Sequence, residues 1–404
     1  MKFLLLWIIG AILYFIFSSQ PINSAIGILT AFIICFFTAL ISNIISDKRI
    51  AYILFFTITL TSFFGITETL TGSHATSTQP FLFGLSFYTA TLAYLIFTKK
   101  YLKYTDVIKL SNPLLLATGP IALFIKDYQY RSFSKRFNYY FPYIVIGVFF
   151  YQIIAVPLTH TFELINSTDL ISALVFASIF ELFVYANFCG LSLIIYGLFG
   201  IIGYRVPLNF RQPFTSTNVI DFWKGWHTSL SPVLKNLFYL PLRKKYSSSI
   251  ALLGVYLASA MWHGVTFNFL LWGLFHALMF IVTIYLLKYR IKYLPLLILI
   301  IAIVIGRLLF ADSQTERLIE KLNFTYNGFH HAFKVLKEIP NSSKAAILLG
   351  FSLISIEFFF RNFKNVSKRN YKHLRTPISL CLLVIIGILL ANNSGVDFAV
   401  YGQR

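Results

Sequence analysis

Residues 249–286 have the sequence SIALLGVYLASAMWHGVTFNFLLWGLFHALMFIVTIYL, which contains no charged residue. A helix needs about 20 apolar residues to cross the roughly 30 Å of hydrocarbon in a bilayer, so this run is long enough for two helices. It is interrupted by Trp262-His263-Gly264 and by Asn268. Polar residues inside such a run are unfavourable unless they face protein or water. The stretch predicts an all-α integral membrane protein and marks these polar positions for closer study.

The rest of the chain follows the same pattern. Of its 404 residues, 57% are hydrophobic and 12% are charged, whereas soluble domains are roughly half apolar and a quarter charged. Roughly eleven transmembrane helices are expected in a single polytopic membrane domain, residues 1–404. The first run lacks a small-x-small cleavage site, so we expect a retained helix rather than a cleaved signal. The runs lie near 3–18, 23–45, 51–68, 80–97, 111–125, 140–158, 169–202, 249–286, 293–310, 343–360 and 377–395.

The formal net charge of +20 reflects membrane topology. Lys and Arg concentrate in short loops, whereas the 69–79 and 159–169 loops contain neither. The positive-inside rule places the basic loops in the cytoplasm and those two loops outside. No soluble basic domain is present, which argues against nucleic-acid binding.

Three stretches depart from a simple series of spans. The run 111–125 is short and flanked by basic loops, which favours a re-entrant or interfacial segment. The run 169–202 is too long for one span and is interrupted at Asn187-Phe188-Cys189-Gly190. The polar stretch 311–342 could hold one short amphipathic helix within a loop. Cys35, Cys189 and Cys381 lie in separate runs, so we expect buried free thiols and no metal site.

The segment from 206 to 242 is too polar to span a membrane. Asn218 is a predicted N-cap, with Asp221 three residues on. A helix beginning there would be amphipathic and lie at the cytoplasmic interface or dip into the protein. Its apolar face would carry Trp223, Trp226, His227, Leu230, Leu234 and Leu237.

Two histidines lie inside the 249–286 run. His263 is about 14 residues into it, near the middle of the membrane. An imidazole there must be hydrogen-bonded by a neighbouring helix or be functional, and burial favours the functional reading for His263. For His276 the structural and functional readings are equally open.

The chain between Glu181 and Phe280 resembles the membrane-bound O-acyltransferase family, in particular its bacterial branch of alginate O-acetylases and teichoic acid D-alanyl transfer proteins. Five elements occur in the order of that family: N-F-x-x-P-F from Asn209, F-W-x-x-W-H-x-S-L from Phe222, Y-L-P-L from Tyr239, W-H-G from Trp262 and W-G-L-F-H from Trp272. The resemblance implies an acyltransferase core at 181–280 with helices arranged around a central funnel.

The resemblance also implies a reaction. An acyl group, acetyl or D-alanyl, would move from a cytoplasmic thioester donor to a hydroxyl of an extracytoplasmic cell-envelope polymer or a partner protein. His263 matches the family's essential histidine and would act as a buried general base, since a hydroxyl needs a base to become a good nucleophile. His227 matches a second polar position and would orient the thioester or stabilise the oxyanion.

Further residues are expected to bind substrate or line the funnel: Trp223, Trp226, Trp262, Asn187, Asn268 and His276. The donor would be a phosphopantetheine carrier protein or acyl-CoA, with no bound cofactor, and a separate extracytoplasmic acyltransferase partner is implied. The chain departs from the family pattern at Asn187, Lys224-Gly225 and Lys235-Asn236, where the family carries more charge. These differences bear on the identity of the acyl donor or its carrier more than on the type of reaction.

Other readings of the chain are a transporter or flippase of envelope precursors and a retired scaffold. Transporters often contain inverted repeats, and no internal repeat is evident here. A scaffold would be favoured by loss of His263, which is present.

Overall fold

The computed structural model describes residues 131–166, 169–311, 315–321 and 328–363 without gaps. It also describes 47–57, 75–98, 104–118, residues 59, 121, 126 and 127, and scattered positions before residue 45 and between 379 and 387. The predicted runs 3–18, 23–45 and 377–395, and much of 51–68, lie wholly or largely outside these residues. Cys381 also lies outside them, whereas Cys35 and Cys189 are buried free thiols, as predicted.

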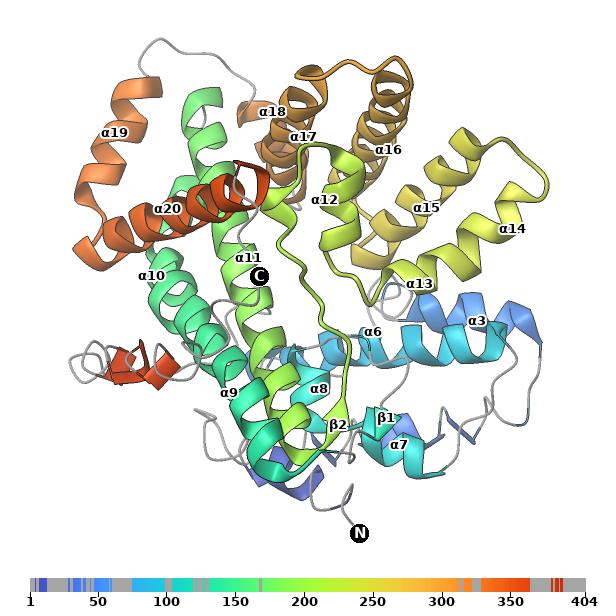
Figure 1. Cartoon of the computed structure of the whole chain (residues 1–404). Coiled ribbons are helices and arrows are strands. Elements are labelled where there is room, and N and C mark those ends of the chain that lie inside the picture. Colours follow the sequence, from blue (N-terminus) through green and yellow to red (C-terminus); the bar gives the residue numbers. More distant parts are fainter. Residues whose placement is uncertain are drawn as a thin grey trace.

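The described chain is almost entirely helical (Figure 1). Its N-terminal elements are α3 (Lys48–Phe55), α6 (Ala75–Phe97), α7 (Tyr104–Leu110), α8 (Pro113–Thr118), β1 (Lys126–Asp127), α9 (Phe133–Val148), η2 (Phe149–Ala155), α10 (Val156–Leu158), η3 (Thr159–Asn166) and α11 (Leu170–Ile202). The central elements are β2 (Tyr204–Arg205), η4 (Pro213–Thr215), α12 (Val219–Gly225), α13 (Ser231–Leu234), η5 (Lys235–Tyr239) and α14 (Leu240–Arg243). The last described elements are α15 (Ser248–His263), α16 (Phe267–Lys288), α17 (Leu294–Ala311), α18 (Thr315–Lys321), α19 (Gly328–Glu338) and α20 (Asn341–Phe363).

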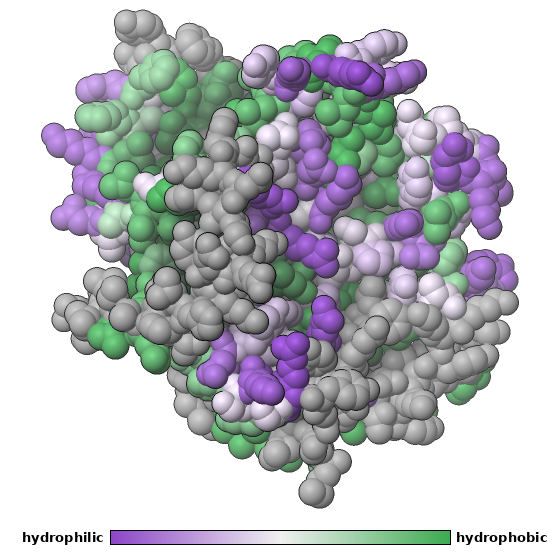
Figure 2. All heavy atoms as spheres, in the orientation of Figure 1, coloured by the Kyte–Doolittle hydropathy of each residue, from purple (hydrophilic) through white to green (hydrophobic). Residues whose placement is uncertain are grey.

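Within the described residues, five helices are long and apolar enough to cross a membrane: Phe133–Phe162, Leu170–Ile202, Phe267–Lys288, Leu294–Ala311 and Asn341–Phe359. Helix α16 shows why they suit a bilayer. Leu270, Leu274 and Leu278 are exposed along one side of it, while Trp272 and His276 are buried. Exposed leucines four residues apart form an apolar stripe that lipid can cover. The space-filling view shows hydrophilic side chains at the α16–α17 and α14–α15 connections, beyond the helix ends (Figure 2).

The long helix α11 lies at the centre of the molecule and packs against α9 and α17 (Figure 1). It runs through Asn187-Phe188-Cys189-Gly190 without a break, so the predicted interruption there is wrong. Gly190 and Gly147 of α9 explain how the two helices approach. A Cβ at Gly190 would lie 2.8 Å from the carbonyl oxygen of Gly147. Small residues at this crossing permit close backbone contact, as is common between membrane helices.

The structure also bears on the predictions for the segments 249–286, 111–125 and 311–342. The 249–286 run divides at His263–Gly264 into α15 and α16, as the polar residues indicated. The run 111–125 contains the six-residue helix α8, which is too short to span a bilayer. The 311–342 stretch holds two short helices, α18 and α19, rather than one.

The single amphipathic helix predicted from Asn218 onward is wrong in its length. Asn218 does cap α12, and its side chain accepts a hydrogen bond from the Asp221 amide at 2.9 Å. The helix ends at Gly225, however, and a new one begins only at Ser231. The residues between them form a buried connection that carries His227.

Candidate active site

The connection that carries His227 is held by the preceding segment of the chain. The Arg211 amide donates to the Gly225 carbonyl and the Thr228 amide donates to the Asn209 carbonyl, each at 2.9 Å. The side chain of Asn209 is completely buried and accepts a hydrogen bond from the Ser229 hydroxyl at 2.8 Å. Gly225 permits this close approach, because a Cβ there would lie 3.1 Å from the Arg211 carbonyl oxygen.

These hydrogen bonds fix an uncommon backbone conformation at His227. Its φ is 46°, in the left-handed region that few residues other than glycine adopt. Such residues persist where the surrounding structure determines their geometry, and they occur often in functional sites. At His227, backbone hydrogen bonds at Gly225 and Thr228, on either side of it, hold this conformation. The two sequence elements that begin at Asn209 and Phe222 therefore form one structural unit.

The His227 side chain is buried among aromatic rings. Its centroid lies 5.0 Å from Phe188, 6.1 Å from Phe87 and 6.2 Å from Trp262. Burial lowers the pKa of His227 to about 4, so the imidazole is neutral near pH 7. Neither ring nitrogen has a hydrogen-bond partner among the described residues. A buried polar group without a partner costs about 1–3 kcal/mol, which makes this ring a candidate for contact with a substrate or ordered water.

His263 is the last residue of α15 and is joined to His227 through the ring of Trp262. Its ring centroid is 5.0 Å from Trp262, which also contacts His227. Phe310 of α17 lies 4.9 Å away and Trp272 of α16 lies 5.8 Å away. His263 lies deep in the protein, as expected, but the residue is accessible on one side. It ends α15 at a turn whose neighbours Met261 and Val265 are also exposed. Aromatic rings therefore surround it on several sides and leave one side accessible.

His276 occupies an adjoining aromatic enclosure. Its ring lies 4.9 Å from Trp272, 5.2 Å from Trp223 and 6.2 Å from Tyr256. A Cβ at Gly306 would lie only 2.2 Å from His276 Nε2, so α17 closes the enclosure. Trp272 contacts both His263 and His276, which links this enclosure to the first.

The other predicted residues lie around these two groups. Trp226 packs on Phe222 at 5.5 Å, and the guanidinium carbon of Arg307 lies 6.0 Å from its ring. Asn268 is completely buried in the first turn of α16. Asn187 precedes Phe188 on α11, and its side-chain nitrogen has no partner among the described residues. The indole nitrogens of Trp223 and Trp262 likewise lack partners there.

From the sequence, Glu181 inside an apolar run either lines the funnel or pairs with a basic residue, and the structure pairs it with Arg307. Arg307 lies in α17 and donates from Nε to a carboxylate oxygen of Glu181 in α11. Its guanidinium carbon also lies 5.1 Å over the ring of Phe310, which contacts His263. A charged residue inside an apolar run singles out Glu181, and the same signal at Arg307 could have identified its partner.

Within the described ranges, no cluster of three His, Cys, Asp or Glu side chains could hold a metal ion. The site instead offers imidazole nitrogens and indole N–H groups in an aromatic surrounding. Such groups can transfer protons and donate hydrogen bonds to a developing negative charge.

The fold and site define a multi-pass membrane protein in which two histidines contact the same tryptophan ring. Residues 89–293, about half of the chain, match the sequence profile of the membrane-bound O-acyltransferase family. The chain belongs to that family.

Several named bacterial proteins are similar to part of the chain. A probable alginate O-acetylase of Pseudomonas putida is 29% identical over 175 residues, which cover 40% of this chain and 36% of that protein. A peptidoglycan O-acetyltransferase of Helicobacter pylori is 29% identical over 36% of this chain and 31% of its own length. A teichoic acid D-alanyltransferase of Bacillus subtilis is 26% identical over 41% of this chain and 47% of its own length. The matched region therefore spans less than half the length of each of these relatives.

Proposed function

We propose that this protein is a membrane O-acyltransferase that moves an acyl group from a thioester to a hydroxyl group. The observation that carries this proposal is the meeting of His227 and His263 at the ring of Trp262. All three residues lie inside the region that matches the family. The accessibility of His263 supports entry of the substrate beside it, and in this proposal the bound substrate contacts both imidazoles.

His263 is the general base in this proposal. It takes the proton of the acceptor hydroxyl as that oxygen attacks the thioester carbonyl carbon. The new C–O bond forms, the C–S bond breaks, and the leaving thiolate receives the proton from His263. The products are an ester and a free thiol, with no change in oxidation state. General acid–base help of this kind contributes roughly 10²–10⁴-fold to the rate. The accessibility of the His263 side chain supports this role, because a base must reach its substrate.

His227 and Trp262 stabilise the tetrahedral intermediate. A neutral imidazole has one N–H donor, and an indole has another. Both side chains are buried, and their nitrogens lack partners among the described residues. Donors that already point at the developing oxyanion lose no reorganisation energy during reaction, and removal of one typically costs about 10²–10³-fold in rate. The strained backbone at His227 supports such a fixed placement.

The substrates follow from topology and from the relatives. The donor is a cytoplasmic thioester, either acyl-CoA or an acyl group on a phosphopantetheine carrier. About eleven spans surround a central funnel in which donor and acceptor meet, in a bacterial cytoplasmic membrane. The relatives are named for acetyl transfer to alginate or peptidoglycan and for D-alanyl transfer to teichoic acid. For this chain we propose acetyl or D-alanyl transfer to a cell-envelope polymer, directly or through an extracytoplasmic acyltransferase partner.

The test is release of ester-linked groups from whole envelopes by mild alkali. Cells express the wild type, His263→Ala, His330→Ala or no protein, with protein levels matched by blotting. His330 is an exposed histidine on α19, outside the proposed site, and controls for the loss of an imidazole. We expect acetate or D-alanine to appear with the wild type and with His330→Ala and to be lost with His263→Ala. Equal release from His263→Ala and the wild type would contradict the mechanism.

A further inference from the structure

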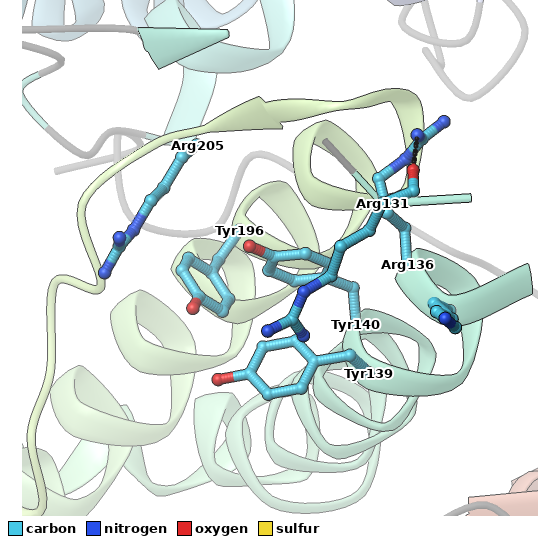
Figure 3. A pocket seen from close by; sticks show the side chains of 7 residues that line it. Arg131, Arg136, Tyr139, Tyr140, Tyr196 and Arg205 are labelled. Atoms are coloured by element: carbon cyan, nitrogen blue, oxygen red, sulfur yellow. Dashed lines mark hydrogen bonds between the residues drawn. The ribbon is translucent and has the colours of Figure 1, made fainter. Parts of the chain in front are cut away.

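A pocket of about 130 Å³ lies between the N-terminal end of α9, the last two turns of α11 and strand β2 (Figure 3). The histidines of the candidate active site do not line it. Figure 3 shows the tyrosines between Arg131 on one side and Arg205 on the other. The lining consists of four cationic side chains and three tyrosines: Arg131, Lys135, Arg136, Arg205, Tyr139, Tyr140 and Tyr196.

The described side chains that line this pocket include no carboxylate. Among the described residues, no acidic group forms an ion pair with Lys135, Arg136 or Arg205. Arg136 is held in place by neutral acceptors instead. Its Nε donates to the Ile201 carbonyl at 3.0 Å, and its Nη1 donates to the Arg131 carbonyl at 2.6 Å. Carbonyl groups fix the direction of the guanidinium and leave its charge uncompensated.

The start of α9 adds to the positive potential. The N-terminus of a helix carries partial positive charge, so cations there are unfavourable and anions are favourable. Helix α9 has no acidic residue in its first turn, and its N-cap Ser132 makes no side-chain hydrogen bond to the helix. Lys135 and Arg136 occupy the first turns instead. In contrast, the N-cap of α11 is Asp169, whose carboxylate accepts a hydrogen bond from the Ser172 amide at 2.8 Å.

The tyrosines supply neutral donors in the same space. Tyr140 and Tyr196 are buried, and their rings meet edge to face at 5.2 Å. Tyr139 packs against Tyr140 at 4.8 Å. Guanidinium groups match the geometry of phosphate oxygens, and hydroxyl groups donate to them. The combination of arginines and phenols at a helix N-terminus, with no carboxylate among the described lining side chains, therefore suits a phosphate group.

We propose that this pocket binds the phosphate group of a ligand, as a phosphomonoester or phosphodiester. This proposal does not depend on the acyltransferase reaction. The positive-inside rule places these basic residues on the cytoplasmic side, where two ligands carry such a group. One is a phosphate-bearing thioester donor and the other is an anionic phospholipid. If these cations served only to orient the protein in the membrane, the pocket would bind phosphate no better than chloride.

The test uses the full-length protein in neutral detergent. Its melting temperature is measured as inorganic phosphate replaces chloride at constant ionic strength. We expect a saturable increase, with the half-saturating phosphate concentration raised about tenfold or more by Arg131→Gln or Arg205→Gln. Lys244→Gln is the matched control, because Lys244 is exposed and lies outside the pocket. If Arg131→Gln does not accumulate, Lys135→Gln replaces it. Equal half-saturating concentrations in all variants, or an equal effect of chloride, would overturn the proposal.

Two further titrations identify the source of the phosphate. Coenzyme A is added in place of inorganic phosphate. Separately, the protein is placed in bilayer discs of phosphatidylcholine with or without phosphatidylglycerol. Stabilisation by coenzyme A that is lost in Arg131→Gln and Arg205→Gln assigns the pocket to the donor. Stabilisation by phosphatidylglycerol that is lost in the same two variants assigns the pocket to an anionic phospholipid.

Discussion

Arg307 of α17 and Glu181 of α11 form an ion pair in the interior of the helix bundle, and their side chains are 11% and 7% exposed. Arg307 also lies over Phe310, which packs against His263. The pair therefore joins the central helix to the helix that supports the candidate base. Removal of one partner from a buried pair leaves an uncompensated charge, which typically costs about 3–5 kcal/mol.

The first prediction concerns this pair. We expect Glu181→Gln and Arg307→Gln each to lower the melting temperature of the detergent-solubilised protein strongly. The double variant should be more stable than the sum of the two losses implies, because it removes both charges. Melting curves of the four proteins form a double-mutant cycle. Additive losses would show that the two side chains do not interact in the folded protein.

Stability should depend on pH through His227. Its pKa in the folded protein is about 4, below its usual value of 6.5, because burial disfavours the charged form. The unfolded chain therefore binds the proton more readily. The contribution of His227 to the free energy of unfolding is fully present above pH 6.5 and is lost as the pH is lowered toward 4, by up to about 3 kcal/mol.

Thermal melts of the wild type and His227→Asn across this pH range measure the effect. Asparagine tolerates positive φ, so this variant keeps the local backbone. Asp221 does not interfere. Its pKa is lowered, first by the hydrogen bond from Lys224, so its contribution is lost only below about pH 4. An identical pH slope in both proteins would refute the assignment to His227.

Gly306 is expected to be intolerant of a side chain. A Cβ there would lie 2.2 Å from Nε2 and 2.8 Å from Cε1 of His276, so the imidazole must move. We expect Gly306→Ala to destabilise the protein by about 1–3 kcal/mol. Gly387→Ala is the control, because a Cβ at Gly387 meets no atom within 4 Å. Partial recovery in Gly306→Ala/His276→Ala would identify the clash, and a normal melting temperature for Gly306→Ala would contradict it.

Accessibility separates the two proposed catalytic histidines. Because His263 is exposed and His227 is buried, imidazole from solution should reach the space left by His263→Ala more readily. We expect added imidazole to raise ester formation by His263→Ala about tenfold, a part of the loss expected for a general base. His227→Ala should not respond. Equal rescue of both variants would mean that the two sites are equally open.

Much of the architecture could be predicted because hydropathy determines it. The membrane class, the division of the 249–286 run and the cap at Asn218 depend on local sequence and are present in the structure. The break after Gly225 could not be predicted in this way. It depends on hydrogen bonds that Asn209 accepts and on one that the Arg211 amide donates. These residues precede the helix in sequence and become neighbours of the 226–230 segment only in the fold.

The extent of burial by the surrounding protein explains where the structure differs from the sequence predictions for α11 and His263. Helix α11 continues through Asn187 and Gly190 because protein surrounds it, and Gly190 packs against Gly147 of α9. An apolar run adjacent to lipid could not accommodate polar residues so readily. His263 was expected to be buried because of its position along the run, but it ends its helix at an exposed turn. Position along a run gives depth in the membrane and does not give accessibility.

The central claim is that His263 and His227 act together in one acyl-transfer site. Alkali-released ester should be measured from cells that express His263→Ala, His227→Ala or the double variant at equal protein levels. We expect each single variant to fall to about 1% of the wild type or less and the double variant to fall no further, because residues that act as a unit are not additive. Ester release by His263→Ala at the wild-type level would contradict the account.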